Sequence, residues 1–349
     1  MDWTAWTNAD DDARQSFARS IDIRVDDFEF VGLATHGLAN VKHRVAIFRG
    51  LVDETKQPFV LIPRGEAMVG FDVERLRSDY VSDAELSAMI ESFDVSRDEY
   101  EIEEDFFDYV SARTTDRRRV AWPTMLVQSG FDEPMWENGD IESDVFKPLV
   151  DAFQDNTNSH VCSTSREIDG EQWEYRVRRV DSSLVAEQYN ASIDFERSLR
   201  SRDSRFRLPS WDEWEFLCGV GAETLFRWGD EAPMDRYPTD LSPEEAEWRR
   251  RWVFSAGTLD PPKEPFRSDD TRHTRPNAIG LTFSGSPYRG EFVAGGRVRG
   301  GDGGCAICGG CGWFLGWFPL ATAYSETFFC EPETPYGPDY TVFRRVLEL

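Results

Sequence analysis

The chain is poor in positive charge, in histidine and in long apolar runs, and each shortage argues against a class of function. Its 349 residues carry 39 Lys and Arg against 65 Asp and Glu, a formal net charge of −26. A field of that sign repels nucleic acid phosphates and anionic membranes, so we expect neither as a partner. No apolar run approaches the length that spans a bilayer, and the first residues lack the basic start and apolar centre of a secretion signal. We therefore expect an acidic protein of the cytoplasm.

Histidine and cysteine are also scarce. The four histidines, His36, His43, His160 and His273, show no metal-ligand spacing, which disfavours an iron site built from clustered imidazoles. The six cysteines are unevenly clustered, and we expect them to be free thiols in a monomer without disulfides. No internal repeat has the period of a solenoid or propeller, so one large domain is expected.

Local patterns predict several elements in the first half of the chain. Within an N-terminal extension, residues 1–55, the runs FEFVGLA and HRVAIFRGLV read as strands, and the second should form a hairpin with FVLIP. Ser82 and Glu85 form a capping box that begins a helix over Ser82 to Phe93. The acidic segment from Asp94 to Asp108 is expected to be a solvated loop.

The middle of the chain has weaker signals. Residues 130–170 read as loops around at most one helix, near Val145 to Phe153. Trp173 to Val180 alternates as a strand does, and Ser183 to Leu199 is predicted to be a helix. The charged, Pro-rich segment from Asp230 to Arg251 is expected to be a surface insertion.

The stretch from Arg205 to Asp230 has the strongest local pattern. Ser210 and Glu213 form a second capping box after Pro209, so a short helix should begin near Trp211. Trp211, Trp214, Leu217 and Cys218 share one face of that helix, and Gly219 and Gly221 supply the backbone freedom that ends it.

Four segments resemble signature motifs of one family in the same order and spacing. They are FVLIPRGEAMVGF, RLPSWDEWEF followed by FRWGDE, PNAIGL and VFRRV. Together they resemble the formylglycine-generating enzyme, or sulfatase-modifying factor, family. The resemblance implies an α+β, C-type-lectin-like fold with much irregular structure over residues 56–349. Arg207, Trp214 and Trp228 fall at signature positions, where an arginine paired with Glu213 or Glu215 and two aromatic core residues are expected.

The resemblance also points to the Gly-rich segment RVRGGDGGCAICGGCGWFLGW. Catalytic members of the family follow a GGS segment with two cysteines that bind Cu(I) and oxidise a substrate cysteine. Here Asp302 stands where the family has Ser, and Cys305 matches the first cysteine. Cys311 lies one residue too far to match the second, and Cys308 two residues too near. The resemblance thus implies a copper-dependent oxidase acting on a thiol or peptide cysteine, with Cys305 and Cys311 as the catalytic pair.

Other interpretations of these cysteines stay open. The spacing of Cys305, Cys308 and Cys311, with Cys330 as a remote fourth ligand, is also typical of an iron-sulfur or zinc site. Small cysteines beside glycines can equally pack in a turn-rich core. The scaffold would then serve as a non-catalytic module that binds a protein or a small-molecule ligand.

Three residues near the cysteines are candidates for a substrate groove, namely Asp302, Trp313 and Trp317. The two tryptophans can equally fill the core. Glu291 and Asp302 offer oxygen ligands for calcium, although a carboxylate that is solvated or bonds the backbone explains them as well.

Overall fold

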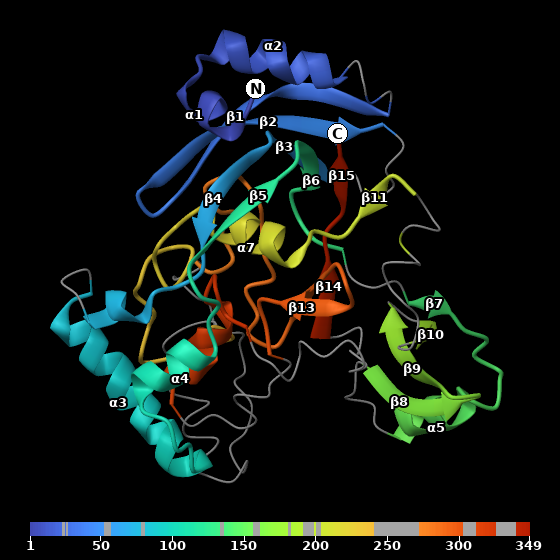
Figure 1. The fold of residues 1–349 in the computed structure, drawn as a ribbon. Helices are drawn as coiled ribbons and strands as arrows, with labels where there is room; N and C mark the ends of the chain where they lie inside the picture. The colour runs from blue at the N-terminus through green and yellow to red at the C-terminus, as the bar shows by residue number, and fades with distance from the viewer. Residues whose placement is uncertain are drawn as a thin grey trace.

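The computed structural model describes residues 1–22, 25, 27–51, 57–77, 81–132, 136–155, 161–180, 183–190, 199, 204–240, 272–302, 312–325 and 340–349. Over these residues the chain has an α+β fold (Figure 1). None of the described helices is both long and apolar enough to cross a membrane.

A six-stranded antiparallel sheet forms the centre of the molecule. Its strands, in spatial order, are β1 (Phe28–Leu38), β2 (Val41–Gly50), β3 (Pro58–Ile62), β6 (Met125–Gln128), β15 (Val346–Glu348) and β11 (Phe206–Arg207). The two expected N-terminal strands and the hairpin into FVLIP are confirmed, because β2 pairs with β3 from Ala46↔Leu61 to Arg49↔Pro58. The N-terminal strands and the first family-like motif therefore share one sheet.

Both faces of this sheet pack against other elements. Successive side chains of a strand point to opposite faces, so alternate residues of β3 belong to different core clusters. Phe59 and Leu61 of β3 pack in one cluster with Trp6 of α1 (Trp3–Asn8) and Ile21 of α2 (Asp11–Asp22). Val60 and Ile62 pack in the other cluster, with Trp214 and Leu217 of α7 (Trp211–Gly219). Figure 1 shows α1 and α2 above the sheet and α7 below it.

Helix α7 begins as the sequence predicts. The Ser210 hydroxyl accepts from the Glu213 backbone N–H at 3.2 Å, and the Glu213 carboxylate accepts from the Ser210 N–H at 2.7 Å.

The end of α7 agrees with the prediction in part, because Gly221 has a positive φ of 75°, but the first left-handed residue after the helix is Val220, with φ 54°. Gly219 stays helical. A Cβ atom at this position would lie 2.5 Å from Thr322 Cγ2, so the close packing here requires glycine.

The predicted helix at Ser82 is confirmed with its capping box, but it is longer than expected. Helix α3 (Asp83–Tyr100) runs seven residues past Phe93, and α4 (Phe106–Ala112) follows shortly after it. The prediction of a solvated loop from Asp94 to Asp108 is therefore wrong over most of its length. The acidic side chains lie on the outer face of α3, while Phe93 packs against Phe106 with ring centroids 5.8 Å apart.

A second sheet, drawn in green in Figure 1, lies beside the main body. It has the order β7 (Glu137–Asn138), β10 (Ser183–Asn190), β9 (Glu171–Val180) and β8 (Val161–Ile168), with α5 (Lys147–Asp155) packed on it. The strand at Trp173 and the helix near Val145 are confirmed.

Two predictions for this region are wrong. The helix expected from Ser183 is strand β10 as far as Asn190, because it pairs antiparallel with β9 from Ser183↔Val180 to Asn190↔Trp173. The rest of that predicted helix lies outside the described residues except for Leu199. Strand β8 lies in the segment that the sequence predicts to be loop. Its side chains are mostly exposed, so the segment has no apolar pattern that would indicate a strand.

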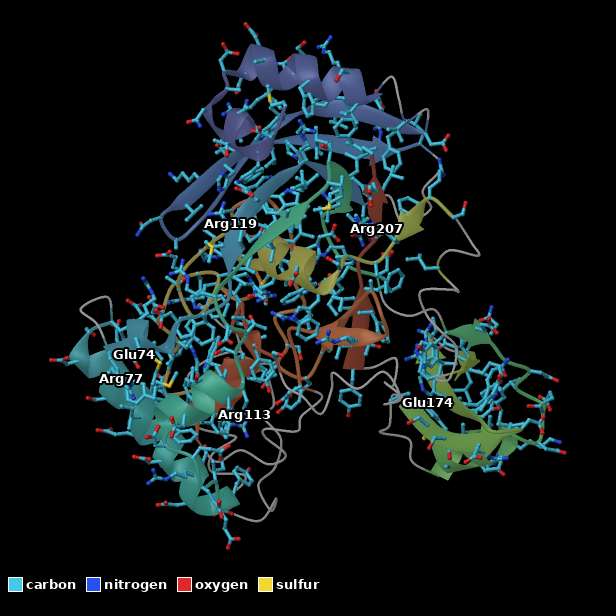
Figure 2. All side chains as sticks on the ribbon, viewed as in Figure 1. Glu74, Arg77, Arg113, Arg119, Glu174 and Arg207 are labelled. Carbon is cyan, nitrogen blue, oxygen red and sulfur yellow. The ribbon has the colours of Figure 1, made fainter. Side chains whose placement is uncertain are left out.

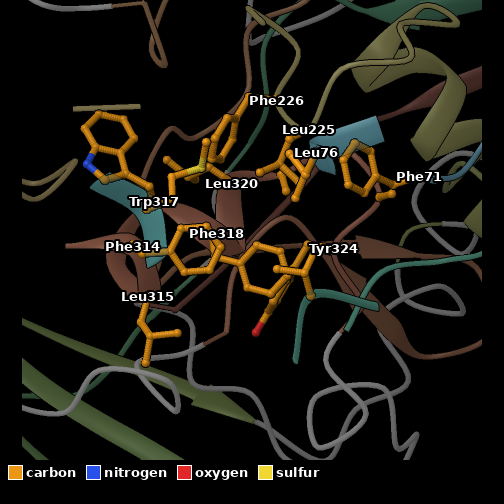
Figure 3. Close-up of a cluster of buried hydrophobic side chains, with 14 of the residues drawn as sticks. Phe71, Leu76, Leu225, Phe226, Phe314, Leu315, Trp317, Phe318, Leu320 and Tyr324 are labelled. Atoms are coloured by element: carbon orange, nitrogen blue, oxygen red, sulfur yellow. The ribbon is translucent and has the colours of Figure 1, made fainter. Parts of the chain in front are cut away.

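The remaining elements are short and surround the lower core. They are β4 (Gly65–Val69), β5 (Arg118–Trp122), β12 (Gly290–Val293), β13 (Arg297–Arg299), β14 (Thr341–Phe343), η1 (Val73–Arg77), α9 (Phe314–Trp317) and η2 (Phe318–Leu320). The aromatic cluster under α3 and α4 includes Phe314 and Trp317 of α9 and Phe318 of η2 (Figure 3). The described strands of the C-terminal part, β12 to β15, have only three or four residues each.

Candidate functional site

The predicted thiolates Cys305, Cys308 and Cys311, and the remote Cys330, lie outside the described residues. The chain on either side of the cluster is described, up to Asp302 and again from Gly312. Within the described ranges, no group of three or more His, Cys, Asp and Glu side chains could hold a metal ion. Copper, iron-sulfur and zinc binding by these cysteines therefore stay predictions.

Asp302 is fixed at one end of the cysteine segment. It follows β13 and is buried, and its backbone N–H donates to the Pro287 carbonyl at 2.8 Å. The two preceding glycines allow this close approach. Gly300 has φ 78°, and a side chain on Gly301 would lie 2.5 Å from the Arg289 backbone. The Gly-Gly pair thus packs the chain tightly against residues 287–290 just before the cysteines.

Helix α9 fixes the other end of the segment. The Ser92 hydroxyl of α3 accepts from the backbone N–H groups of Trp313 and Phe314, at 2.7 and 2.9 Å. Trp313 is half-buried, with its ring centroid 4.6 Å from that of Tyr237. The two ends of the cysteine segment are therefore held by separate parts of the fold.

Trp317 is a core residue in this arrangement. It is 1% exposed, and its Nε1 donates to the Arg236 carbonyl at 2.8 Å. Figure 3 shows its ring in the aromatic cluster with Phe314 and Phe318.

A pocket enclosing about 210 Å³ lies between these two anchored ends. Asp302 lines it from one side and Leu315 and Gly316 of α9 from the other. Loop residues complete the lining, namely Tyr237, Thr239, Pro287 and Tyr288. The structure thus places Asp302 opposite α9 across the pocket, while Trp313 and Trp317 are not among the described residues that line it, and the substrate groove stays a prediction. The sequence could not indicate the loop residues, because no periodic pattern links positions so far apart.

A second pocket enclosing about 280 Å³ lies beneath α7. Trp214 and Cys218 line it from the helix, and Arg227, Phe283 and Arg299 line it from the loops. Burial raises the pKa of the Cys218 thiol and outweighs the opposite effect of the nearby Arg227, so the thiol is neutral. Sequence reasoning missed Arg227 although it stands in the FRWGDE motif, because its hydrogen-bond partner, the His273 carbonyl, lies far away in the sequence.

Glu291 is the buried carboxylate considered above for calcium. Its two oxygens accept hydrogen bonds from Arg344 Nε and Nη2, at 2.7 and 3.0 Å. Both groups are almost completely buried, so the carboxylate acts as the counterion of that arginine. A calcium ion at Glu291 would have to compete with this bidentate pair, and calcium binding stays a prediction.

Comparison of the chain with protein-family models and with curated proteins finds no match. The family resemblance therefore rests on the four sequence motifs.

Proposed function

We propose that this chain is a divergent member of the formylglycine-generating enzyme family, with a C-type-lectin-like fold, and that it oxidises a thiol or a peptide cysteine with copper. The observation that carries the proposal is the pocket bordered by Asp302 and α9, because these are the anchored ends of the segment that holds Cys305 and Cys311. A substrate group seated there would lie next to that segment.

The motif residues support the proposal because they make buried contacts around α7. Asn277 of PNAIGL donates to the carbonyls of Leu217 and Cys218, at 2.6 and 3.0 Å, where the helix ends. Its side-chain oxygen accepts from the backbone N–H of Leu281 at 3.0 Å. Arg344 of VFRRV is completely buried against Glu291. Asn277 thus ties the PNAIGL motif to α7, and Arg344 ties the VFRRV motif to β12.

Of the candidate ligands at this pocket, only the cysteines have the ligand atoms that copper prefers. Soft thiolates are the ligands that Cu(I) prefers, so Cys305 and Cys311 would hold the ion. The carboxylate of Asp302 is a hard oxygen ligand, and we assign it to orienting the substrate. When bound, the copper would mediate electron transfer from the substrate thiol to dioxygen, which would be the oxidant.

Anaerobic titration with Cu(I) against a competing chelator tests this proposal. The wild-type protein should hold one tight equivalent, because two converging thiolates bind Cu(I) far more tightly than single exposed cysteines do. Cys305→Ser and Cys311→Ser should each abolish tight binding. Cys308→Ser is the matched control and should leave it intact.

Two outcomes of the titration would overturn the copper proposal. A cluster held by three or four thiolates, of the iron-sulfur or zinc kind, would lose its metal with any of the three changes. If the wild type binds copper no more tightly than the triple serine variant, the chain is instead a non-catalytic binding module. The half-buried Trp313 and Tyr237 pair beside the pocket favours that second function, since such pairs are common in ligand contacts.

A further inference from the structure

Three buried arginines lie around the pocket beneath α7 that contains Cys218. Arg227 is 6% exposed, Arg299 is 1% exposed and Arg344 is completely buried. Arg227 and Arg299 line the pocket directly, together with Trp214. They come from segments far apart in sequence, so the fold itself gathers these charges.

Two of the three arginines have carboxylate partners. Arg344 pairs with Glu291, as described above. Arg299 donates through Nη2 to Glu215 Oε2 at 3.0 Å, but that same oxygen also accepts from Arg118 Nη2 at 3.0 Å. Glu215 is thus shared between two cations.

Arg227 has no carboxylate partner among the described residues. Its Nη2 donates to the His273 carbonyl, and its guanidinium lies beside the neutral thiol of Cys218. Aromatic faces surround the rest of the group, with the Phe283 centroid 5.4 Å and the Trp228 centroid 5.3 Å from its central carbon.

The carboxylate of Glu291 also lines the pocket and acts on Arg227 electrostatically, but it forms its ion pair with Arg344. The charge of Arg227 therefore has no carboxylate of its own among the described residues, and a buried cation of this kind favours an anion beside it.

Several buried hydrogen-bond donors near the same pocket also lack an acceptor among the described residues. Trp214 Nε1, Arg227 Nε, and Arg299 Nε and Nη1 have no hydrogen-bond acceptor among the described residues, although all four atoms are buried. All three residues line this one pocket. Buried donors are almost always satisfied in folded proteins, so their gathering is a second indication of a bound acceptor, independent of the charge balance.

We propose that this pocket is a binding site for a small carboxylate anion. A carboxylate is planar and offers two acceptor oxygens, which suits guanidinium donors and an indole N–H. Phe283 and Leu320 form apolar walls of the pocket, which suit a short alkyl group on the acid. The site is distinct from the cysteine segment and does not depend on copper.

Titration calorimetry with sodium acetate at a constant sodium concentration tests the site. The wild type should show saturable one-to-one binding. Arg227→Gln should weaken binding tenfold or more, because a charge-assisted hydrogen bond is replaced by a neutral one. Trp214→Phe keeps the aromatic ring, removes only the N–H, and should weaken binding less.

Arg119→Gln is the matched control. Arg119 lies on the surface of β5, where it is exposed and pairs with Glu66 (Figure 2). This change removes the same charge from the chain and should leave acetate binding unaltered. Acetate should also raise the thermal midpoint of the wild type and of Arg119→Gln but not of Arg227→Gln, which separates loss of the site from loss of the fold.

Three results would overturn the proposal. Wild-type protein that shows no saturable heat has no such site. If Arg119→Gln and Arg227→Gln weaken acetate binding equally, the binding depends only on the net charge of the protein. Saturation by sodium chloride with the same affinity as acetate would exclude a site built for carboxylates.

Discussion

Arg207 shows how the contribution of an ion pair to stability depends on the burial of the partner carboxylate. Its guanidinium donates to both oxygens of Glu213, at 2.7 and 2.8 Å, and also meets Glu348 at 3.2 Å. The Glu213 side chain is 7% exposed, whereas that of Glu348 is 56% exposed. The same cation therefore has one buried and one solvated partner (Figure 2).

We predict that Glu213→Ala lowers the free energy of unfolding by about 3–5 kcal/mol, because it leaves a partly buried arginine with only its solvated partner, Glu348, and removes half of a capping box. Glu348→Ala should cost less than about 1 kcal/mol, since an exposed ion pair contributes little. Urea denaturation of both variants measures the difference. Similar losses for the two would contradict this account of the pair.

The residue-scale predictions from sequence succeed where a contact is local. The capping boxes at Ser82 and Ser210 involve residues three apart, so the sequence alone identified them. Arg227 and the loop side of the Asp302 pocket were not predictable, because their neighbours come from distant segments. Only the folded chain brings His273 to Arg227 or Tyr237 to Asp302.

At the scale of elements, α7 connects the sheet to the pocket that contains Cys218. Trp214 on its buried face is 2% exposed and meets Phe283 edge to face, with ring centroids 5.5 Å apart. Gly300 fits against the same ring, since a side chain there would lie 2.8 Å from Trp214 Cζ2. Trp214 thus holds α7 in the core together with Phe216 and Leu217, which are completely buried.

We predict that Trp214→Ala costs about 3–5 kcal/mol of stability, as expected for truncating a large buried aromatic side chain. Trp211→Ala is the matched control on the same helix. Trp211 is half-buried and stacks on Arg297, whose guanidinium carbon is 3.7 Å from the ring centroid, so its loss should cost clearly less. A Trp214→Ala variant that melts like the wild type would refute the anchoring role of α7.

Elements with weak periodicity were the ones predicted wrongly. The segment from Ser183 to Asn190 contains good helix formers, yet eight consecutive pairs with β9 hold it as a strand. Tertiary pairing overrides local propensity here. In the segment from Asp94, acidic residues suggested solvent, but α3 exposes them on one face only while Ser96 is completely buried on the other.

On the scale of the whole molecule, the sequence predicted an α+β chain with short C-terminal strands, and this is what the described residues form. It did not indicate that residues 137–190 form a separate sheet, since strands with exposed faces carry no strong apolar pattern. The positions of the two pockets, one between α9 and Asp302 and one beneath α7, also depend on the packing of long loops. Such loops have no repeating pattern from which a contact could be predicted.

The central claim is that Cys305 and Cys311 hold one copper ion next to the pocket of Asp302. X-ray absorption at the copper edge, on protein loaded anaerobically with one equivalent of Cu(I), tests it most directly. We predict a Cu(I) centre with two sulfur neighbours, unchanged in Cys308→Ser and lost in Cys305→Ser. A centre with three sulfur neighbours, or one bound only by nitrogen and oxygen, would contradict the account.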